Sequence, residues 1–236
     1  MLISGIQRFT MLDYPGKTSC IVFVPGCNFR CGYCHNPEFV LPKLIQKIKD
    51  SFIPEENFFK FLNKRQGLLD GVTISGGEPT IMPDLADFIQ RIKNMGFLVK
   101  IDTNGNLPDR LKTIIDLGLV DYIAMDLKTS SEHYSKLVGP GADKDKINQS
   151  IVLIKDSGVP YEFRSTLIRD IHDKPKLMKM AEMISGADKL YLQYFRSGHT
   201  LDPAYNKYKP FSEHETKKMA KEIFEPYVRE VFIREA

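Results

Sequence analysis

Residues 26–36 of the chain read GCNFRCGYCHN, a stretch that places Cys27, Cys31 and Cys34 within eight residues. Their spacing is C-x3-C-x2-C, and no cysteine follows them in the rest of the sequence. A cubane iron-sulfur cluster normally takes one cysteine thiolate for each of its four irons. Three thiolates therefore predict a [4Fe-4S] cluster with one iron open to a small molecule. An open metal site indicates chemistry rather than scaffolding.

Cysteine clusters also form structural zinc sites and electron-transfer centres. Zinc takes four tetrahedral ligands, usually as two separated pairs, and the only further candidates near the triplet are His35 and Cys20. His35 adjoins Cys34, and adjacent residues rarely both turn onto one metal, so zinc is disfavoured. Cys20 as a fourth ligand would give a fully ligated, ferredoxin-like electron-transfer module. Its place in the apolar run 19–24 predicts instead a buried strand residue.

Composition limits the class of protein. The chain has 236 residues, 42% of them hydrophobic, which suffices for one large α/β domain. The net charge of +3 is the difference between 33 basic and 30 acidic residues, and it predicts no nucleic-acid partner. The densest basic patch, residues 43–49, is typical of a solvated surface. No stretch approaches the roughly 20 apolar residues of a membrane span, and no leader pattern is present, so we expect a cytoplasmic protein with reduced thiols and no membrane partner.

Strand-like apolar runs alternate with amphipathic helical patterns. Strands are expected at 19–24, 72–75, 97–102, 121–126, 160–166 and 189–194, and helices at 55–66, 84–95, 108–117, 131–137, 145–157 and 175–185. A further helix is expected at 211–226, before a last strand at 227–234. The alternation predicts a parallel sheet with helices outside. Six βα units are two short of a full eight-stranded barrel, so the sheet is either doubly wound or a partial, open barrel.

Candidate functional residues lie at or near the C-terminal ends of the expected strands, where such a fold places its active site. Besides the cysteine loop, these residues are Gly76, Gly77, Glu78, Asp102, Thr103, Asn104, Asp126, Lys128 and Arg164. Each group also has a purely structural interpretation: Asn104 with Gly105 as a turn, Asp126 with Lys128 as an ion pair, and Arg164 as a surface charge. Their shared position at successive strand ends favours a functional site.

Together these motifs resemble those of the radical SAM superfamily, and within it the glycyl-radical-enzyme activating proteins. The resemblance runs from about residue 5 to residue 196 and is carried by the cysteine triplet followed by GGEP at 76–79. CHN at 34–36, DTNG at 102–105 and DLK at 126–128 narrow it to the activating proteins. Taken whole, the chain is most similar to the anaerobic ribonucleoside-triphosphate reductase activating proteins.

The resemblance implies an α/β fold that is a partial (β/α)6 TIM-like barrel in one domain, residues 1–236, with a core of about 15–196 and an extension at 197–236. It implies a radical SAM [4Fe-4S] enzyme that reductively cleaves S-adenosylmethionine to a 5'-deoxyadenosyl radical. That radical would generate a glycyl radical on a partner enzyme, anaerobic ribonucleoside-triphosphate reductase, with flavodoxin or ferredoxin as a reductant. With four cysteines in the chain, no auxiliary cluster is expected.

Alternative functions stay open at this point. The chain could activate pyruvate formate-lyase or another glycyl radical enzyme. It could act on a small molecule, although no substrate-specific insertion is obvious in the sequence. The electron-transfer module with Cys20 as fourth ligand is the alternative that is not an enzyme.

The resemblance implies that no residue is catalytic beyond the cluster and S-adenosylmethionine, and that the cofactor contacts are Tyr33, Gly76, Gly77, Glu78, Asn104, Lys128 and Arg164. Backbone groups near the glycines, with Glu78, would hold the methionyl ammonium, and Tyr33 would lie against adenine. Arg164 would pair with the methionine carboxylate or with the partner protein. Asp102, Thr103 and Asp126 are the implied ligands of a monovalent cation beside that carboxylate.

Two further positions matter for the comparison with this family. Asp13 in LDYPG matches a position near the substrate channel and is an implied partner contact, although it also fits a turn before Pro15. Phe195 stands where the pyruvate formate-lyase activating enzyme has a histidine that approaches the cofactor, and phenylalanine cannot form that hydrogen bond. His199 is close in sequence and could compensate, or could be a surface residue.

Overall fold

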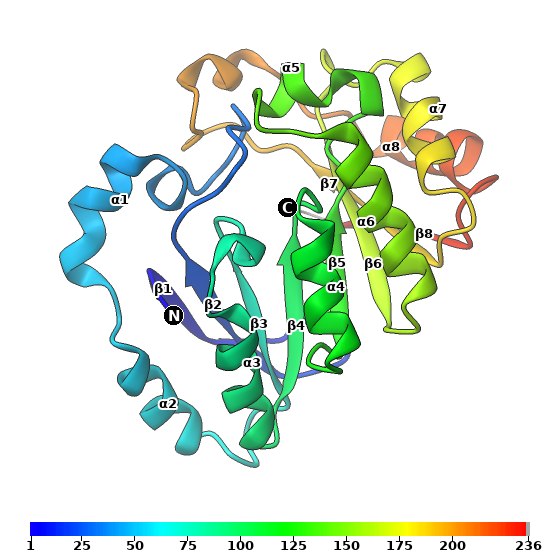
Figure 1. Ribbon diagram of the computed structural model, residues 1–236. Helices are drawn as coiled ribbons and strands as arrows, with labels where there is room; N and C mark the ends of the chain where they lie inside the picture. Colours follow the sequence, from blue (N-terminus) through cyan, green and yellow to red (C-terminus); the bar gives the residue numbers. More distant parts are fainter. Residues whose placement is uncertain (235–236) are drawn as a thin grey trace. The chain divides into compact units, whose positions relative to one another are not determined.

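The computed structural model describes residues 1–234, in which strands and helices alternate as the sequence predicts (Figure 1). The strands are β1 (Gly5–Thr10), β2 (Ser19–Val24), β3 (Gly71–Gly76), β4 (Leu98–Thr103), β5 (Tyr122–Asp126), β6 (Tyr161–Leu167), β7 (Lys189–Tyr194) and β8 (Glu230–Arg234). The α-helices are α1 (Pro42–Ile48), α2 (Glu55–Asn63), α3 (Leu85–Asn94), α4 (Pro108–Asp116), α5 (Tyr134–Val138), α6 (Lys144–Asp156), α7 (Lys174–Met183) and α8 (Glu213–Met219). Short 3-10 turns are η1 (Pro37–Phe39), η2 (Lys49–Ser51), η3 (Pro79–Ile81), η4 (Ser131–His133) and η5 (Pro203–Lys207), whereas η6 (Ala220–Phe224) is a π-helix.

The strands lie in the order β1 to β8, which is also their order along the chain. β1 pairs with β2 in antiparallel fashion, whereas the pairs β2–β3, β3–β4, β6–β7 and β7–β8 are parallel. A doubly wound sheet reverses its strand order at a switch point, and the described strands show no reversal. The predicted α/β class is therefore confirmed, with an open, mainly parallel sheet of the partial-barrel kind.

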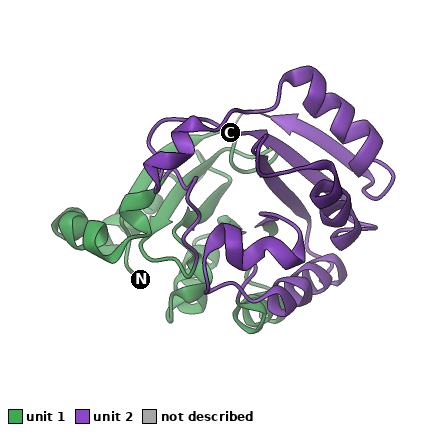
Figure 2. Cartoon of the chain, turned by 90° about the horizontal axis from the view of Figure 1, so that it is seen from above, with its two compact units in different colours: residues 1–28, 36–103, 107–123 green, residues 29–35, 104–106, 124–236 purple. Residues whose placement is uncertain are grey.

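The chain divides into two compact units (Figure 2). Unit 1 contains residues 1–28, 36–103 and 107–123, and unit 2 contains residues 29–35, 104–106 and 124–236. The chain passes from one unit to the other inside the cysteine loop and again around residues 104–106. The predicted core of residues 15–196 with an extension at 197–236 is a different division, and it stays a prediction.

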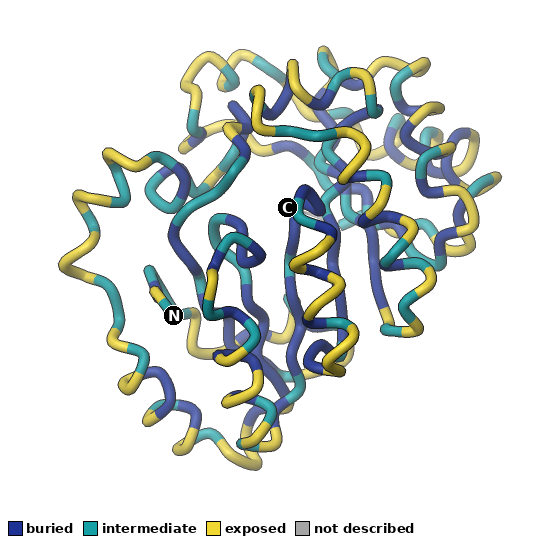
Figure 3. Tube along the Cα trace, viewed as in Figure 1, coloured by how far each residue is buried: buried dark blue, intermediate teal, exposed yellow. Residues whose placement is uncertain are grey.

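The core of unit 1 is built on β2, β3 and β4. All of β2 is buried except Phe23, and Cys20 is fully buried opposite Val72 of β3, as expected for a core residue. The buried positions follow these strands in Figure 3. Helix α3 packs against β4, and Phe58 of α2 stacks on Phe88 of α3 with 5.5 Å between ring centroids. Buried aromatic rings contribute much of the apolar area that holds such helices in place.

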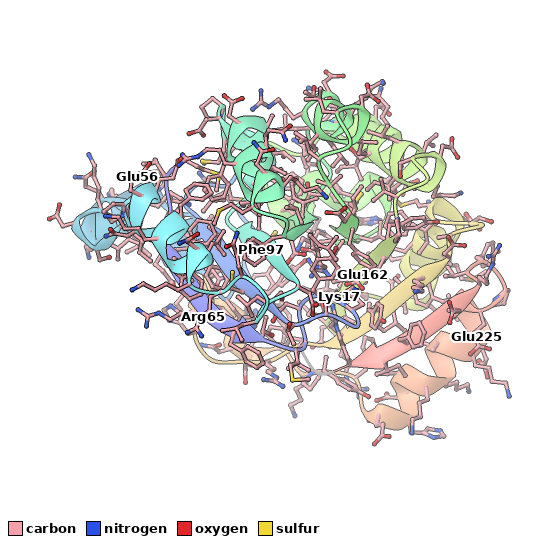
Figure 4. The ribbon with its side chains drawn as sticks, turned by 90° about the horizontal axis from the view of Figure 1, so that it is seen from below. Lys17, Glu56, Arg65, Phe97, Glu162 and Glu225 are labelled. Atoms are coloured by element: carbon pink, nitrogen blue, oxygen red, sulfur yellow. The ribbon has the colours of Figure 1, made fainter. Side chains whose placement is uncertain are left out.

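Unit 2 contains the parallel strands β6, β7 and β8, of which β6 and β7 contribute buried residues to its core. Glu162 of β6, labelled in Figure 4, has no exposed surface and accepts a hydrogen bond from Arg234 of β8 at 3.2 Å. The pairing offsets the cost of burying that carboxylate. Helix α8 begins with a capping box, in which Ser212 and Glu215 each accept from the other's backbone amide.

The structure departs from the expected elements in a few places. β1 was not predicted because most of its residues are exposed or half-buried, so it lacks apolar alternation. Helix α1 overlaps the basic run 43–49 and has no buried residue. The sequence predicted that this run is exposed to solvent, but not that it is helical. The expected helix 211–226 is α8 followed by the π-helix η6, and 131–137 is divided between η4 and α5. None of the described helices is long and apolar enough to cross a membrane.

We expect Phe58→Ala to lower the free energy of unfolding by about 3–5 kcal/mol, because it deletes a fully buried ring and leaves a cavity. Urea denaturation followed by circular dichroism measures this change. Leu68→Ala, at a side chain that is 63% exposed, is the control and should stay within about 0.5 kcal/mol of the wild type. Equal effects of the two substitutions would contradict this description of the core.

Candidate functional site

The cysteine loop starts directly after β2. Cys27 belongs to unit 1 and is half-buried, whereas Cys31 and Cys34 belong to unit 2, where Cys31 is buried and Cys34 half-buried. The backbone amide of Cys34 donates to the carbonyl of Cys31 at 3.0 Å. Two of the three predicted ligands therefore lie within one tight turn of unit 2.

In unit 1, the glycine-rich loop after β3 is bound to the start of the cysteine loop. Gly77 donates its backbone hydrogen to the carbonyl of Val24 at 2.8 Å, and Glu78 donates to the carbonyl of Gly26 at 2.7 Å. A Cβ added to Gly77 would lie 1.8 Å from the carbonyl oxygen of Gly26, and one added to Gly76 would lie 2.4 Å from the nitrogen of Val24. The two glycines thus allow the chain to approach itself beside Cys27.

The Glu78 carboxylate is buried and accepts hydrogen bonds from Thr80 and Thr103. The donors are the backbone amide of Thr80 at 3.2 Å, its hydroxyl at 2.5 Å, and the hydroxyl of Thr103 at 2.7 Å. Asp102, the neighbour of Thr103 in β4, forms an ion pair with the buried Lys100. Unit 1 therefore brings together the predicted residues that follow β3 and those that end β4.

In unit 2, Asp126 is the centre of a charged network. Its Oδ2 accepts from Nζ of Lys128 at 2.9 Å, and its Oδ1 accepts from Nε of Arg164 at 2.9 Å. Burial opposes ionisation of Asp126, but Arg164 and Lys128 outweigh it and hold the pKa of this carboxyl well below its usual range. Burial likewise opposes the charge on Lys128, yet Asp126 holds the pKa of the ammonium well above its usual value. All three groups are charged at neutral pH.

Lys128 is also fixed through its backbone, by residues that the sequence did not reveal. Its amide donates to the hydroxyl of Tyr134 at 3.0 Å, and its carbonyl lies 2.9 Å from Nε2 of His172. Nδ1 of His172 accepts from the amide of Ile168, so Nε2 carries the hydrogen that bonds Lys128. Burial lowers the pKa of His172, which keeps the ring neutral in this role. His172 lies 44 residues from Lys128 in the chain, and no local spacing relates them.

Tyr33 lies inside unit 2 with its ring near two other side chains. Nζ of Lys128 is 5.9 Å from the centroid of the Tyr33 ring, and the centroid of the Tyr205 ring is 6.1 Å away. Burial raises the pKa of Tyr33 well above its usual value. Within the described part of the chain, its buried hydroxyl has no hydrogen-bond partner. Most buried polar atoms have a hydrogen-bond partner, so this hydroxyl is a candidate for contact with a ligand.

The segment after β7 holds the cysteine loop of unit 2 by its backbone. Leu201 donates to the carbonyl of Cys34, and Asp202 donates to the carbonyl of Gly32, each at 2.9 Å. The ring of Tyr205 lies so close to Gly32 that a Cβ there would be 2.0 Å from it. The sequence left the role of residues 197–236 undefined, and part of this segment supports the cysteine loop.

Asn104 and Gly105 form a turn, as one sequence interpretation expected. Oδ1 of Asn104 accepts from the amide of Asn106 at 3.0 Å, and Gly105 has φ of 76°. The hydroxyl of Ser150 donates to the carbonyl of Gly105 at 2.6 Å and anchors the turn to α6. The turn also holds Asn104 in a buried position.

The remaining predicted positions lie in different surroundings. Asp13, in unit 1, accepts from the hydroxyl of Thr10 at 2.6 Å in the turn after β1. Phe195, in unit 2, is buried with its ring centroid 6.4 Å from that of His35. His199 is exposed in the segment after β7.

The cysteines have the chemistry that an iron-sulfur cluster takes, although residues 1–234 contain no preformed group of three His, Cys, Asp or Glu side chains. Burial raises the pKa of the Cys31 thiol to about 11, despite the opposing effect of Lys128. Iron would bind the deprotonated thiol and release its proton. The donor set therefore fits the cluster, with Lys128 as a nearby positive charge that favours the thiolate.

We expect Gly32→Ala to lower the melting temperature, because its Cβ overlaps the ring of Tyr205. Adding Tyr205→Ala should restore part of the loss, since neighbouring substitutions that share a clash are not additive. Differential scanning calorimetry of the two single variants and the double variant measures this coupling. Gly5→Ala is the control, because its Cβ would meet its nearest neighbour at 3.6 Å. Strict additivity would show that Tyr205 does not pack on the loop.

In folded protein without a cluster, iodoacetamide should alkylate Cys20 and Cys31 more slowly than Cys27 and Cys34. Burial raises the pKa of Cys20 to about 12 and that of Cys31 to about 11, and only the thiolate reacts. Below these pKa values each rate should climb as the pH is raised. Mass spectrometry of the digested protein gives the rates, and denatured protein, in which all four should react alike, is the control. Rapid reaction of folded Cys20 would contradict its placement in β2.

Sequence comparisons show the family to which this chain belongs. The model of the Radical SAM superfamily matches residues 21–181. A Methanocaldococcus jannaschii protein provisionally named glycyl-radical enzyme activating enzyme is 34% identical over 239 residues, which cover 99% of this chain and 95% of that protein. The pyruvate formate-lyase-activating enzyme of Clostridium pasteurianum is 28% identical over 218 residues, covering 87% of this chain and 84% of that enzyme.

Solved structures share the fold at low sequence identity. SuiB of Streptococcus suis, bound to its precursor peptide SuiA, has a TM-score of 0.64 and 14% identity, covering 91% of this chain and 48% of SuiB, so the chain spans about half of SuiB. QueE from Escherichia coli has a TM-score of 0.52 and 13% identity, covering 99% of this chain and 93% of QueE. The chain is thus a radical SAM enzyme, a member of the superfamily that uses a [4Fe-4S] cluster and S-adenosylmethionine, and it is similar over nearly its whole length to a relative named as a glycyl-radical enzyme activating enzyme.

Proposed function

We propose that this enzyme reductively cleaves S-adenosylmethionine and generates a glycyl radical on a partner protein, with anaerobic ribonucleoside-triphosphate reductase as the partner. The observation that carries the proposal is similarity along 99% of the chain to a relative named for glycyl-radical activation. The pyruvate formate-lyase-activating enzyme is similar over less of the chain, so activation of pyruvate formate-lyase is the second candidate.

Cys27, Cys31 and Cys34 would hold three irons of the cluster. The cluster and S-adenosylmethionine supply the electron transfer and the carbon-centred radical, and the protein contributes binding, orientation and exclusion of water. Cys20 is disfavoured as a fourth ligand because it is fully buried in β2 against Val72 of β3. The fully ligated electron-transfer module is therefore disfavoured.

In unit 1, Glu78 would face the methionyl ammonium of S-adenosylmethionine, beside backbone groups of Gly76 and Gly77. The support is a buried carboxylate held in place by the hydroxyls of Thr80 and Thr103. A fixed carboxylate with little solvent interacts strongly with a cation, and its orientation is set before the ligand binds.

In unit 2, Tyr33, Asn104, Lys128 and Arg164 would contact the rest of S-adenosylmethionine. Tyr33 offers an aromatic ring for adenine and a hydroxyl that lacks a partner within the described chain. Lys128 and Arg164 are both held by Asp126, so their positive charges are fixed in position before a carboxylate binds. Arg164 pairs with the methionine carboxylate or with the partner protein.

The protein substrate would contact the turn that carries Asp13. Its neighbours Met11 and Leu12 are 67% and 83% exposed, which is unusual for large apolar side chains and favours a protein contact. The net charge of +3 gives no reason to expect nucleic acid. We propose flavodoxin or ferredoxin as the reductant and the cytoplasm as the location, where thiols stay reduced.

We expect Cys31→Ala to lose the cluster and the cleavage of S-adenosylmethionine to methionine and 5'-deoxyadenosine. Cys20→Ala should keep both, because Cys20 is a core residue. Iron content and product chromatography under anaerobic conditions, with a strong reductant, measure the two properties. Cluster loss in Cys20→Ala equal to that in Cys31→Ala would show that four cysteines bind the cluster.

The partner is tested by electron paramagnetic resonance. The enzyme is mixed with S-adenosylmethionine, reductant and either anaerobic ribonucleoside-triphosphate reductase or pyruvate formate-lyase, and a glycyl radical doublet is expected on the reductase. A doublet on pyruvate formate-lyase alone would show that pyruvate formate-lyase, and not the reductase, is the partner. Cleavage of S-adenosylmethionine with no radical on either protein would instead favour a small-molecule substrate.

A further inference from the structure

The resemblance assigns a monovalent cation to Asp102, Thr103 and Asp126, but each of these groups already has a partner in its own unit. Asp102 forms an ion pair with Lys100. The hydroxyl of Thr103 donates to Glu78 at 2.7 Å. The carboxylate oxygens of Asp126 accept from two different cationic side chains, as described above. Positive charge is therefore present at both carboxylates without a metal ion.

Lys100 is unusual because it is 1% exposed in the middle of β4. Its partner across the sheet is Thr73 of β3, which is also buried. A lysine in such surroundings keeps its charge only beside an opposite charge. The buried ammonium of Lys100 therefore needs a carboxylate within ion-pair distance.

Asp102 supplies that carboxylate through strand geometry. Residues two apart in a strand point to the same face, which brings the side chains of Lys100 and Asp102 together. The side chain of Asp102 is 13% exposed, more than that of Lys100, so the ammonium lies on the buried side of the pair. Both members of the pair therefore come from one strand, β4.

Asp126 is equally unsuited to a metal cation. Lys128 and Arg164 place two positive charges around one negative carboxylate. A further cation would be repelled by both of these positive charges, which makes Asp126 a poor ligand for a metal cation.

We propose that Lys100 is a built-in cation. Its ammonium supplies at Asp102 the positive charge that the resemblance assigns to a monovalent metal, so the enzyme requires neither Na⁺ nor K⁺. Lys100 is a positioning residue: it orients and neutralises Asp102 and does not touch the reacting atoms. The proposal rests on the proposed function only for the identity of the bound molecule, S-adenosylmethionine.

The first test uses the cluster-loaded wild-type enzyme in choline, sodium or potassium chloride at equal ionic strength. The melting temperature and the KM for S-adenosylmethionine should be the same in the three salts. A rise in melting temperature of about 3 °C or more in sodium or potassium, the size expected for specific binding worth about 1 kcal/mol, would overturn the proposal. So would a KM that falls about tenfold on adding either ion, a change of about 1.4 kcal/mol.

The second test uses Lys100→Met, which keeps the length of the side chain and removes its charge. In choline this variant should melt lower than the wild type and have a higher KM for S-adenosylmethionine, with a smaller change in kcat. Sodium or potassium should restore part of both losses, because Asp102 then lacks its built-in cation. A variant with wild-type KM and no response to either ion would contradict the proposal.

Lys93→Met is the matched control, because Lys93 pairs with Asp121 at 2.6 Å in the same unit but is partly exposed. It should show no response to sodium or potassium. The melting temperatures need no catalysis, so they decide the role of Lys100 even if the enzyme proves not to cleave S-adenosylmethionine. If Lys100→Met does not fold, the wild-type salt comparison still decides.

Discussion

Parallel pairing of neighbouring strands is the constraint on which the site depends, because it places the carboxyl ends of those strands at the same edge of a sheet. In unit 1, β2, β3 and β4 run parallel. The consequence is direct: Glu78 after β3 bonds Gly26 after β2, and Thr103 at the end of β4 bonds Glu78. Three motifs separated by long stretches of chain become one hydrogen-bonded group.

Buried charge is the second constraint, and local partners satisfy it. Lys100 and Asp102 meet on one strand, and Asp126 is held between Lys128 and Arg164. Fixed charges of this kind need little reorganisation when a charged cofactor binds, which is how a protein favours radical chemistry without taking part in it. In our proposal, the ion pair with Lys100 takes the place of a metal ion at Asp102.

The sequence predicted the elements whose pattern is carried by burial. β2 is an apolar run, and α3, α4 and α6 end just before Gly96, Gly118 and Gly158, as expected for glycines that follow helix ends. The sequence did not predict β1, because most of its residues are exposed or half-buried and do not alternate between apolar and polar. Glu78, Thr103 and Asp126 lie at or just after strand ends, as expected, whereas Arg164 lies within β6.

The partners of those residues could not be predicted in the same way. Tyr205 packs on Gly32 from the far end of the chain, and His172 bonds Lys128 across 44 residues. Such contacts depend on tertiary packing, which leaves no periodic pattern in the sequence. The sequence did not predict a role for Lys100, because a single lysine in an apolar strand does not itself indicate that the lysine is buried.

If three cysteines hold the four-iron cluster, one iron stays open for S-adenosylmethionine. Mössbauer spectroscopy of the ⁵⁷Fe-loaded enzyme, with and without S-adenosylmethionine, can detect that iron. We expect the cofactor to change the isomer shift of one iron and to leave the other three unaltered. If the spectrum stayed the same for all four irons although the cofactor was shown to be bound, no iron would be open to it.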